Sequence, residues 1–201
     1  MSLRETKAEL RRQMRKLRAN MGDEARAAAS LAIVQRVLAH ESYAQAETVA
    51  LYADFRQEVQ VEALLAGARR DGKRVVLPRV EDGGTLTLRL VLPEAPLVLS
   101  PLGIAEPASS SPTVAPRQVD LFVVPGLAFD TRGGRLGYGR GHYDRLLLSA
   151  QGNATLVGLA FECQVVDAVP LEVHDVRLNH VVTERRWLAG QAPGADRRED
   201  G

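Results

Sequence analysis

The segment VDLFVVP, residues 119–125, is a short run of strand-forming, largely apolar residues. A run without polar alternation is typical of a strand that is buried on both faces of a sheet. A second apolar run, ATLVGLAF at 154–161, follows it. Between them lie a glycine-rich loop and a helical segment at about 141–150. This order of strand, helix and strand predicts a layered α/β sheet.

The rest of the chain supplies further elements of the same kind. An apolar stripe from Leu10 to Met21 predicts an N-terminal helix that ends at Gly22, and Asp23 is expected to cap a second helix. The alternating segment 85–91 follows the turn EDGG and predicts an antiparallel strand, which makes the sheet mixed. Other strands are expected at 48–53, 73–78 (closed by Pro78) and, last in the chain, 179–184, with helices at 24–40 and 61–72.

These elements predict one three-layer α/β domain over residues 1–188, with a mixed, largely parallel central sheet flanked by helices. The segment 93–118 carries six prolines and is expected to be an irregular surface connection. Residues 189–201, rich in glycine and charge, are expected to be a disordered tail. In such sheets ligands bind beyond the C-terminal ends of the strands, where the glycine loop falls.

Charge and composition restrict the classes of partner. The 201 residues hold 26 Lys and Arg against 25 Asp and Glu, so no net field draws the chain to nucleic acid or to a membrane. Seven basic residues in positions 1–20 leave a nucleic-acid-binding helix as an alternative, but aromatic residues are not interleaved with them. We therefore expect no nucleic-acid partner and no membrane partner.

The location of the protein is predicted from what the sequence lacks. The N-terminus has no apolar secretory core, and no apolar run approaches the roughly 20 residues that span a bilayer. Cys163 is the single cysteine, which fits a reducing compartment, and it is expected to be a small buried hydrophobe. We expect a soluble cytoplasmic protein that is a monomer or a weak oligomer.

The glycine loop GGRLGYGRGHYDR, residues 133–145, concentrates chemistry in one place. Backbone amides can surround an anion where side chains are absent, and the following helix presents its positive end to the same point. Arg135 and Arg140 offer guanidinium groups to phosphate oxygens, and Asp144 offers a carboxylate to Mg²⁺. The loop matches neither the P-loop motif nor the GxGxxG dinucleotide motif. It predicts a nucleotide site, with a glycine-rich turn carrying solvated arginines as the alternative.

The stretch VVPGLAFDTRGGRLGYGRGHYDRLL resembles the signature of the 5-formyltetrahydrofolate cyclo-ligase family. Three more segments resemble that family in the same order, namely KAELR at 7–11, LYADFRQEVQVEALL at 51–65 and VPLEVHDVRLNHVVTE at 169–184. The resemblance implies a single α/β domain. It also implies the ATP-dependent cyclisation of 5-formyltetrahydrofolate to 5,10-methenyltetrahydrofolate with magnesium, releasing ADP and phosphate through a phosphorylated formyl intermediate.

The resemblance also implies roles for particular residues. ATP would be bound by Lys7, Arg11, Arg135, Leu136, Gly137, Tyr138, Gly139, Arg140, Gly141, His142 and Tyr143. The folate substrate would be bound by Ala53, Glu58, Tyr138, Gly139, Arg140, Gly141 and His142. The catalytic residues would be Arg140 and Tyr143, and magnesium would be held by Asp144 and Asp175.

The residue types suit these roles. Lys7 and Arg11 are four residues apart and therefore share a helix face, although a solvated basic face has the same spacing. The carboxylate of Glu58 can accept the paired N–H donors of a pterin ring, although a loop acid is more often solvated. His142 departs from the tyrosine that is common in the family. A non-catalytic relative that only binds folate or nucleotide is the alternative function.

Overall fold

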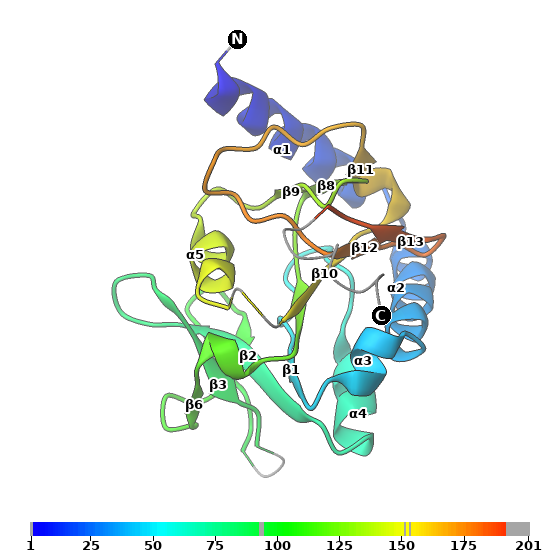
Figure 1. Cartoon of the computed structure of the whole chain (residues 1–201). Helices are drawn as coiled ribbons and strands as arrows, with labels where there is room; N and C mark the ends of the chain where they lie inside the picture. The colour runs from blue at the N-terminus through cyan, green and yellow to red at the C-terminus, as the bar shows by residue number, and fades with distance from the viewer. Residues whose placement is uncertain (1, 93–94, 151, 153, 192–201) are drawn as a thin grey trace, which may run out of the picture.

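The computed structural model describes residues 2–92, 95–150, 152 and 154–191 (Figure 1). Its central sheet has the strand order β13-β12-β10-β7-β1-β2-β3-β6. The bounds of these strands are β1 Thr48–Ala50, β2 Arg74–Val80, β3 Leu86–Leu90, β6 Thr113–Val114, β7 Leu121–Val124, β10 Thr155–Leu159, β12 His180–Val182 and β13 Trp187–Ala189. The two apolar runs of the sequence are the central strands β7 and β10.

The sheet is mixed and largely parallel, which confirms the predicted fold class. Strands β2, β1, β7, β10 and β12 are parallel neighbours. Strand β3 pairs antiparallel with β2, as the turn EDGG predicts, and β13 pairs antiparallel with β12. The antiparallel strand β3 and the strand β6 beyond it extend the sheet on one side, and β13 closes the other.

Alternate side chains of the strands pack into two cores on opposite faces of the sheet. Val49 and Leu51 join the core under α2 (Asp23–Leu38), α3 (Glu41–Gln45) and α4 (Glu62–Arg70). Ala50 points to the other face, where Leu146 and Leu147 of α5 (His142–Leu148) complete a second core. Figure 1 shows α2, α3 and α4 on one side of the strands and α5 on the other.

The N-terminal helix α1 (Leu3–Ala19) lies across a small second sheet at one end of the domain (Figure 1). A capping box between Ser2 and Glu5 fixes its first turn. Met14, 2% exposed, packs into a third core with Leu127 and Leu136. The small sheet contains β8 (Ala128–Asp130), β9 (Arg135–Leu136) and β11 (Val165–Val166). Packing on this sheet places one face of α1 over the loops that follow the central strands.

The two central crossovers leave β1 and β7 toward opposite faces of the sheet. The chain runs from β1 through α4 to β2, and from β7 through α5 to β10. Strands β1 and β7 are adjacent, and their helices cover opposite faces, so a crevice opens beyond their C-terminal ends. The loop after β1 carries Glu58, and the segment after β7 leads to the glycine loop.

Two predictions for the middle of the chain were wrong, namely the end of one strand and the irregular structure of one segment. Strand β2 continues through Pro78 to Val80, because its register with β1 ends at Val76 and the missing amide hydrogen is tolerated beyond that point. The proline-rich segment 93–118 was expected to be irregular, but it contains β6, which adds to the central sheet. It also contains the short pair β4 (Val98–Leu99) and β5 (Ala105–Glu106).

Two predictions near the C-terminus also need correction. The strand at 179–184 is not the last one, because Trp187–Ala189 folds back on it, and the amides of Gly190 and Gln191 donate to Asn179 and Arg132. The ordered chain thus extends past residue 188, while residues 192–201 of the predicted tail lie outside the described residues. Cys163 is exposed, not buried, and its thiol lies 3.7 Å from the sulfur of Met21.

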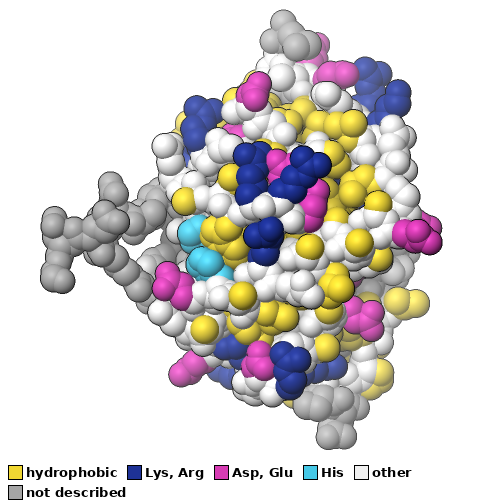
Figure 2. Space-filling model, turned by 90° about the vertical axis from the view of Figure 1, so that its right-hand side faces the viewer, with side chains coloured by type: hydrophobic (Ala, Val, Ile, Leu, Met, Phe, Trp, Pro, Cys, Tyr) yellow, Lys and Arg dark blue, Asp and Glu magenta, His cyan; other side chains and the backbone are white. Residues whose placement is uncertain are grey.

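The described surface agrees with a balanced charge. Figure 2 shows basic and acidic side chains interspersed among hydrophobic ones on one face of the molecule. None of the described helices has the length and hydropathy that a bilayer crossing requires.

Candidate active site

A cavity of about 220 Å³ lies between α1, the glycine loop, the start of α5 and the segment 172–175. Each of the predicted nucleotide and metal residues lines it. The lining residues are Lys7, Arg11, Pro125, Arg135, Leu136, Gly137, Tyr138, Gly139, Arg140, Gly141, His142, Tyr143, Asp144, Glu172, His174 and Asp175. Three segments that are distant in sequence, namely α1, residues 125–144 and residues 172–175, therefore meet at one pocket beyond the C-terminal end of β7.

The glycine loop owes its path to backbone conformations that favour glycine. Gly139 has φ 101° and Gly141 has φ 64°, values that other residues rarely adopt. No described residue accepts a hydrogen bond from the backbone amides of residues 138–141. These amides belong to residues that line the cavity and are free to donate to a ligand, as an anion site requires.

The side chain of Arg135 is buried beneath this loop and holds it through an ion pair. It is 3% exposed, and its Nη2 donates to Oδ1 of Asp144 at 2.7 Å. The guanidinium also lies over the ring of Tyr143, 5.8 Å from the centroid. The sequence predicts a phosphate contact for Arg135, and the structure shows instead an internal ion pair that ties β9 to the first turn of α5. A direct phosphate contact stays a prediction.

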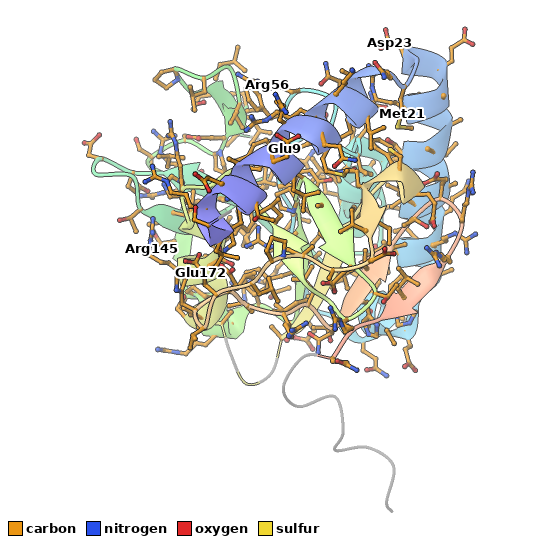
Figure 3. The ribbon with its side chains drawn as sticks, turned by 90° about the horizontal axis from the view of Figure 1, so that it is seen from above. Glu9, Met21, Asp23, Arg56, Arg145 and Glu172 are labelled. Atoms are coloured by element: carbon orange, nitrogen blue, oxygen red, sulfur yellow. The ribbon has the colours of Figure 1, made fainter. Side chains whose placement is uncertain are left out.

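The basic face of α1 meets an acidic segment across the pocket. Nζ of Lys7 donates to Oε2 of Glu172 and to Oδ2 of Asp175, each at 2.7 Å. Burial would raise the pKa of Asp175, but the hydrogen bond and charge of Lys7 outweigh burial and hold that pKa below its usual value. One turn further along, Nε of Arg11 donates to the carbonyl of Gly137 at 2.9 Å. Figure 3 shows Glu172 and Arg145 near the N-terminal end of α1.

Arg140 and His142 occupy the outer part of the pocket. Arg140 is exposed, and no described acidic group lies within ion-pair distance of it, so it can meet an incoming anion. His142 is partly buried, and burial followed by the charges of Arg145 and Arg140 lowers its pKa. The imidazole Nε2 approaches the β2–β3 turn, since a Cβ added at Gly84 would lie 3.7 Å from it.

Glu58 lies behind the cavity lining and reaches it through Tyr138. The phenol of Tyr138 donates to Oε1 of Glu58 at 2.5 Å, and the amide of Phe55 donates to Oε2 at 2.9 Å. Glu58 is 8% exposed, and this burial raises its pKa, although both hydrogen bonds act in the opposite direction. Each carboxylate oxygen keeps a lone pair for a ligand donor.

The loop that carries Glu58 is locally strained. Arg56 has φ 50°, which is uncommon for a residue with a side chain, and it lies across α1 from Glu172 in Figure 3. Ala53, at the start of the same loop, is half-buried, and it is not among the described residues that line the cavity.

A protein-family model for the 5-formyltetrahydrofolate cyclo-ligase family matches residues 3–184 of this chain. The chain belongs to this family. It is 34% identical to the 5-formyltetrahydrofolate cyclo-ligase of Haemophilus influenzae over 174 residues, which cover 85% of this chain and 93% of that protein. It is 37% identical to the enzyme of the same name from Escherichia coli K12 over 152 residues, covering 74% and 84% of the two chains.

A solved structure of the same family has the same fold as this cyclo-ligase. The NMR structure of Aquifex aeolicus 5,10-methenyltetrahydrofolate synthetase superposes with a TM-score of 0.82 at 31% sequence identity. The match covers 96% of this chain and 99% of that structure. The protein is therefore an enzyme, a cyclo-ligase, with a cyclo-ligase fold over nearly its whole length.

The acidic groups at the pocket of the cyclo-ligase suit a divalent cation. Oδ1 of Asp144 and Oδ2 of Asp175 have protein partners, while no described group donates to the other oxygen of either residue. Glu172, His174 and Asp175 bring ligand atoms within 4.8 Å of one another. The ammonium of Lys7 already lies against two of these carboxylates, so the position accommodates positive charge. Oxygen donors of this kind are the ligands that Mg²⁺ prefers.

Sequence reasoning missed several residues of this site. Glu172 precedes Asp175 by three residues and shares Lys7 with it, and this spacing could have drawn attention to it. Pro125 and His174 also line the cavity. Arg18, on the last turn of α1, is 2% exposed and lies against Tyr138. Because it is one of many basic residues in this helix, the sequence did not indicate that it is buried.

Proposed function

We propose that this protein catalyses the ATP- and magnesium-dependent cyclisation of 5-formyltetrahydrofolate to 5,10-methenyltetrahydrofolate, with release of ADP and phosphate. The observation that carries the proposal is the contact between Tyr138 and Glu58. It joins a loop of unsatisfied amides and basic side chains to a buried carboxylate at a single crevice. A triphosphate and a pterin bound at these two places would meet at the glycine loop.

The phosphate side of the site supports ATP as co-substrate. Lys7 and Arg11 from α1, Arg140 from the loop and the amides of residues 138–141 all contribute positive potential to one cavity. Phosphoryl transfer asks a protein chiefly to position the groups and to neutralise charge on the transferring phosphoryl. Arg140, which is exposed and lines the cavity, would supply that charge in the transition state. Tyr143, which is partly buried and packs under the guanidinium of Arg135, would hold the first turn of α5 in place.

Magnesium would be held by Asp144 and Asp175, with Glu172 beside them. Bound there, it would supply positive charge at the phosphate oxygens. Arg135 would keep Asp144 directed into the pocket, since it fixes one of the two carboxylate oxygens. Lys7 would be released from Asp175 as a phosphate group enters, and its ammonium would then pair with a phosphate oxygen.

The folate side would be formed by Glu58 and the glycine loop. The two oxygens of Glu58 would accept paired N–H donors of the pterin, while Ala53, Gly139, Gly141 and His142 would border the ring system. This arrangement would direct the formyl group toward the nucleotide. Tyr138 is 38% exposed, which leaves room for the pterin ring to lie against its side chain.

We infer a two-step reaction from this placement. The formyl oxygen forms a bond to the γ-phosphorus of ATP, and the bond to the bridging oxygen breaks as ADP leaves. N10 then attacks the activated formyl carbon, loses its proton, and phosphate departs with the former formyl oxygen. The protein needs no nucleophile of its own.

The test follows the near-UV absorbance of the methenyl product. Protein, 5-formyltetrahydrofolate and magnesium are incubated with and without ATP, and ATP without magnesium is the third condition. Growth of the product band that requires both ATP and magnesium supports the proposal. A flat trace with intact folate binding would show a non-catalytic binding protein instead.

Two variants assign the two halves of the site. Arg140→Ala is expected to lower kcat by a factor of about 100 or more, since it removes charge stabilisation of the transition state. Arg132→Ala, an exposed arginine on the preceding turn, is its control. Glu58→Ala is expected chiefly to raise the KM for folate. Normal turnover of Arg140→Ala, or an unchanged folate KM of Glu58→Ala, would remove that residue from its role.

A further inference from the structure

Arg18 is a buried cation to which the reaction proposed above assigns no role. It is 2% exposed, and no carboxylate in the described chain lies within ion-pair distance of it. Its Nη2 donates to the phenol oxygen of Tyr138 at 3.2 Å, its Nη1 lies 3.5 Å from the carbonyl of Gly126, and its Nε has no hydrogen-bond partner among the described residues. A buried charge without a direct counter-ion is costly, so the burial of Arg18 calls for an explanation.

The contacts form a chain with a fixed direction. A guanidinium can only donate hydrogen bonds, so the oxygen of Tyr138 must accept from Arg18. The single phenol proton of Tyr138 is then left to donate to Oε1 of Glu58, at 2.5 Å. Arg18 therefore orients the proton of Tyr138 toward the carboxylate that the proposed function assigns to the pterin.

The charge of Arg18 reaches the same carboxylate. Burial raises the pKa of Glu58, the hydrogen bonds from Tyr138 and Phe55 lower it, and the charge of Arg18 lowers it further. The charged and titratable groups that act on Glu58 are Arg18, Asp54, Tyr52, Tyr138 and Tyr143. Arg18 is the cation in this set, so it favours the ionised form that can accept two N–H donors.

We propose that Arg18 is a positioning residue for the folate substrate: acting through Tyr138, it keeps Glu58 ionised and fixes the orientation of its carboxylate. Arg18 itself does not line the cavity, and it would touch neither the folate nor the nucleotide. The inference rests on the pterin role of Glu58 in the proposed function. It adds a residue on α1 whose effect should appear in folate affinity and not in ATP affinity.

The central experiment compares Arg18→Met with Arg12→Met, a substitution of an exposed arginine on the same helix. The dissociation constant of 5-formyltetrahydrofolate is measured by titration calorimetry without ATP, and the KM for ATP is measured separately. Arg18→Met is expected to weaken folate binding about tenfold or more, the effect of losing a hydrogen bond that involves a charged group. It should leave the ATP KM within about twofold of wild type, since its hydrogen bonds go to the phenol oxygen of Tyr138 and the carbonyl of Gly126 and not to the loop amides proposed for the phosphates.

Two readouts distinguish positioning from a structural role. Without the charge of Arg18, the pKa of Glu58 should rise. As the pH is lowered, Arg18→Met should therefore begin to lose folate affinity at a higher pH than wild type does. Tyr138→Phe breaks the same chain while keeping Arg18, so it should weaken folate binding similarly. The variant that carries both substitutions should bind folate about as tightly as the weaker-binding single variant, because the two changes remove one connected interaction.

Several results would overturn the inference. Equal losses of folate and ATP affinity, an unshifted pH profile, or additive effects of the two substitutions would each make Arg18 a structural residue. If Arg18→Met does not fold, Tyr138→Phe and Arg18→Lys decide: the first should weaken folate binding and the second should preserve it, and any other pair of results refutes the inference. Glu58→Ala separates the two proposals. If it leaves folate binding unchanged, the pterin role fails, whereas weakened binding with a normal Arg18→Met variant rejects only the role of Arg18.

Discussion

Asp130 offers a quantitative test of how the glycine loop is held in place. Its carboxylate is completely buried. Oδ1 accepts from the amides of Arg132 at 2.9 Å and Gly134 at 2.8 Å, and Oδ2 accepts from the amide of Val169 at 2.8 Å. One side chain thus fixes the turn that leads into β9 and joins it to the segment before residue 172.

The expected loss of stability follows from these three hydrogen bonds. In Asp130→Ala the buried amides of Gly134 and Val169 lose their acceptor, and each loss costs about 1.5–2 kcal/mol. Water can replace the third hydrogen bond, because Arg132 is exposed. The free energy of unfolding should therefore fall by about 3–4 kcal/mol. Asp130→Asn keeps one oxygen for the two amides on the Oδ1 side and leaves Val169 facing an NH₂ group, so about half of that loss is expected, roughly 2 kcal/mol.

The assay is urea unfolding at neutral pH, with the midpoint of thermal unfolding as a second measure. For a chain of this size, Asp130→Ala should lower that midpoint by about 10 °C. Asp167→Ala, an exposed aspartate to which no described residue donates a hydrogen bond, should behave as wild type. The reasoning is refuted if Asp130→Ala unfolds within about 1 kcal/mol of wild type, or if Asp130→Asn loses as much stability as Asp130→Ala.

Three further expectations follow. Lys7→Met should raise the KM for ATP about tenfold, since it removes a cation and leaves Glu172 and Asp175 to repel the triphosphate, while the exposed Arg12→Met should not change it. Gly158→Ala should lower the free energy of unfolding by about 1–3 kcal/mol, because the added Cβ would lie 2.6 Å from the ring of Phe129, whereas Gly22→Ala meets open space. Burial raises the pKa of all four tyrosines, that of Tyr138 to about 12, so above pH 10 the unfolded chain releases tyrosine protons that the native protein keeps. Stability in urea should therefore fall as pH rises from about 10 to 12, and tyrosinate absorbance should appear only with unfolding; early tyrosinate absorbance in the native protein would contradict this.

The sequence by itself determined the parallel centre of the sheet and the position of the glycine loop. The runs that became β7 and β10 are apolar because both faces of those strands are covered, and that pattern is visible without a structure. Gly139 and Gly141 could be singled out because few other residue types favour positive φ. The spacing of Lys7 and Arg11 placed both on one face of α1, and both line the cavity.

Only the tertiary structure decided which charged groups pair. Local sequence presents Arg135 and Arg140 as equivalent arginines of one loop, yet Arg135 is buried against Asp144 and Arg140 is exposed. Arg18 resembles any residue of a basic helix until α1 is packed across the small sheet, which brings it against Tyr138. The contacts of Arg18 with Tyr138 and of Lys7 with Asp175 join segments more than 100 residues apart, and the periodicity of a single segment carries no information about such contacts.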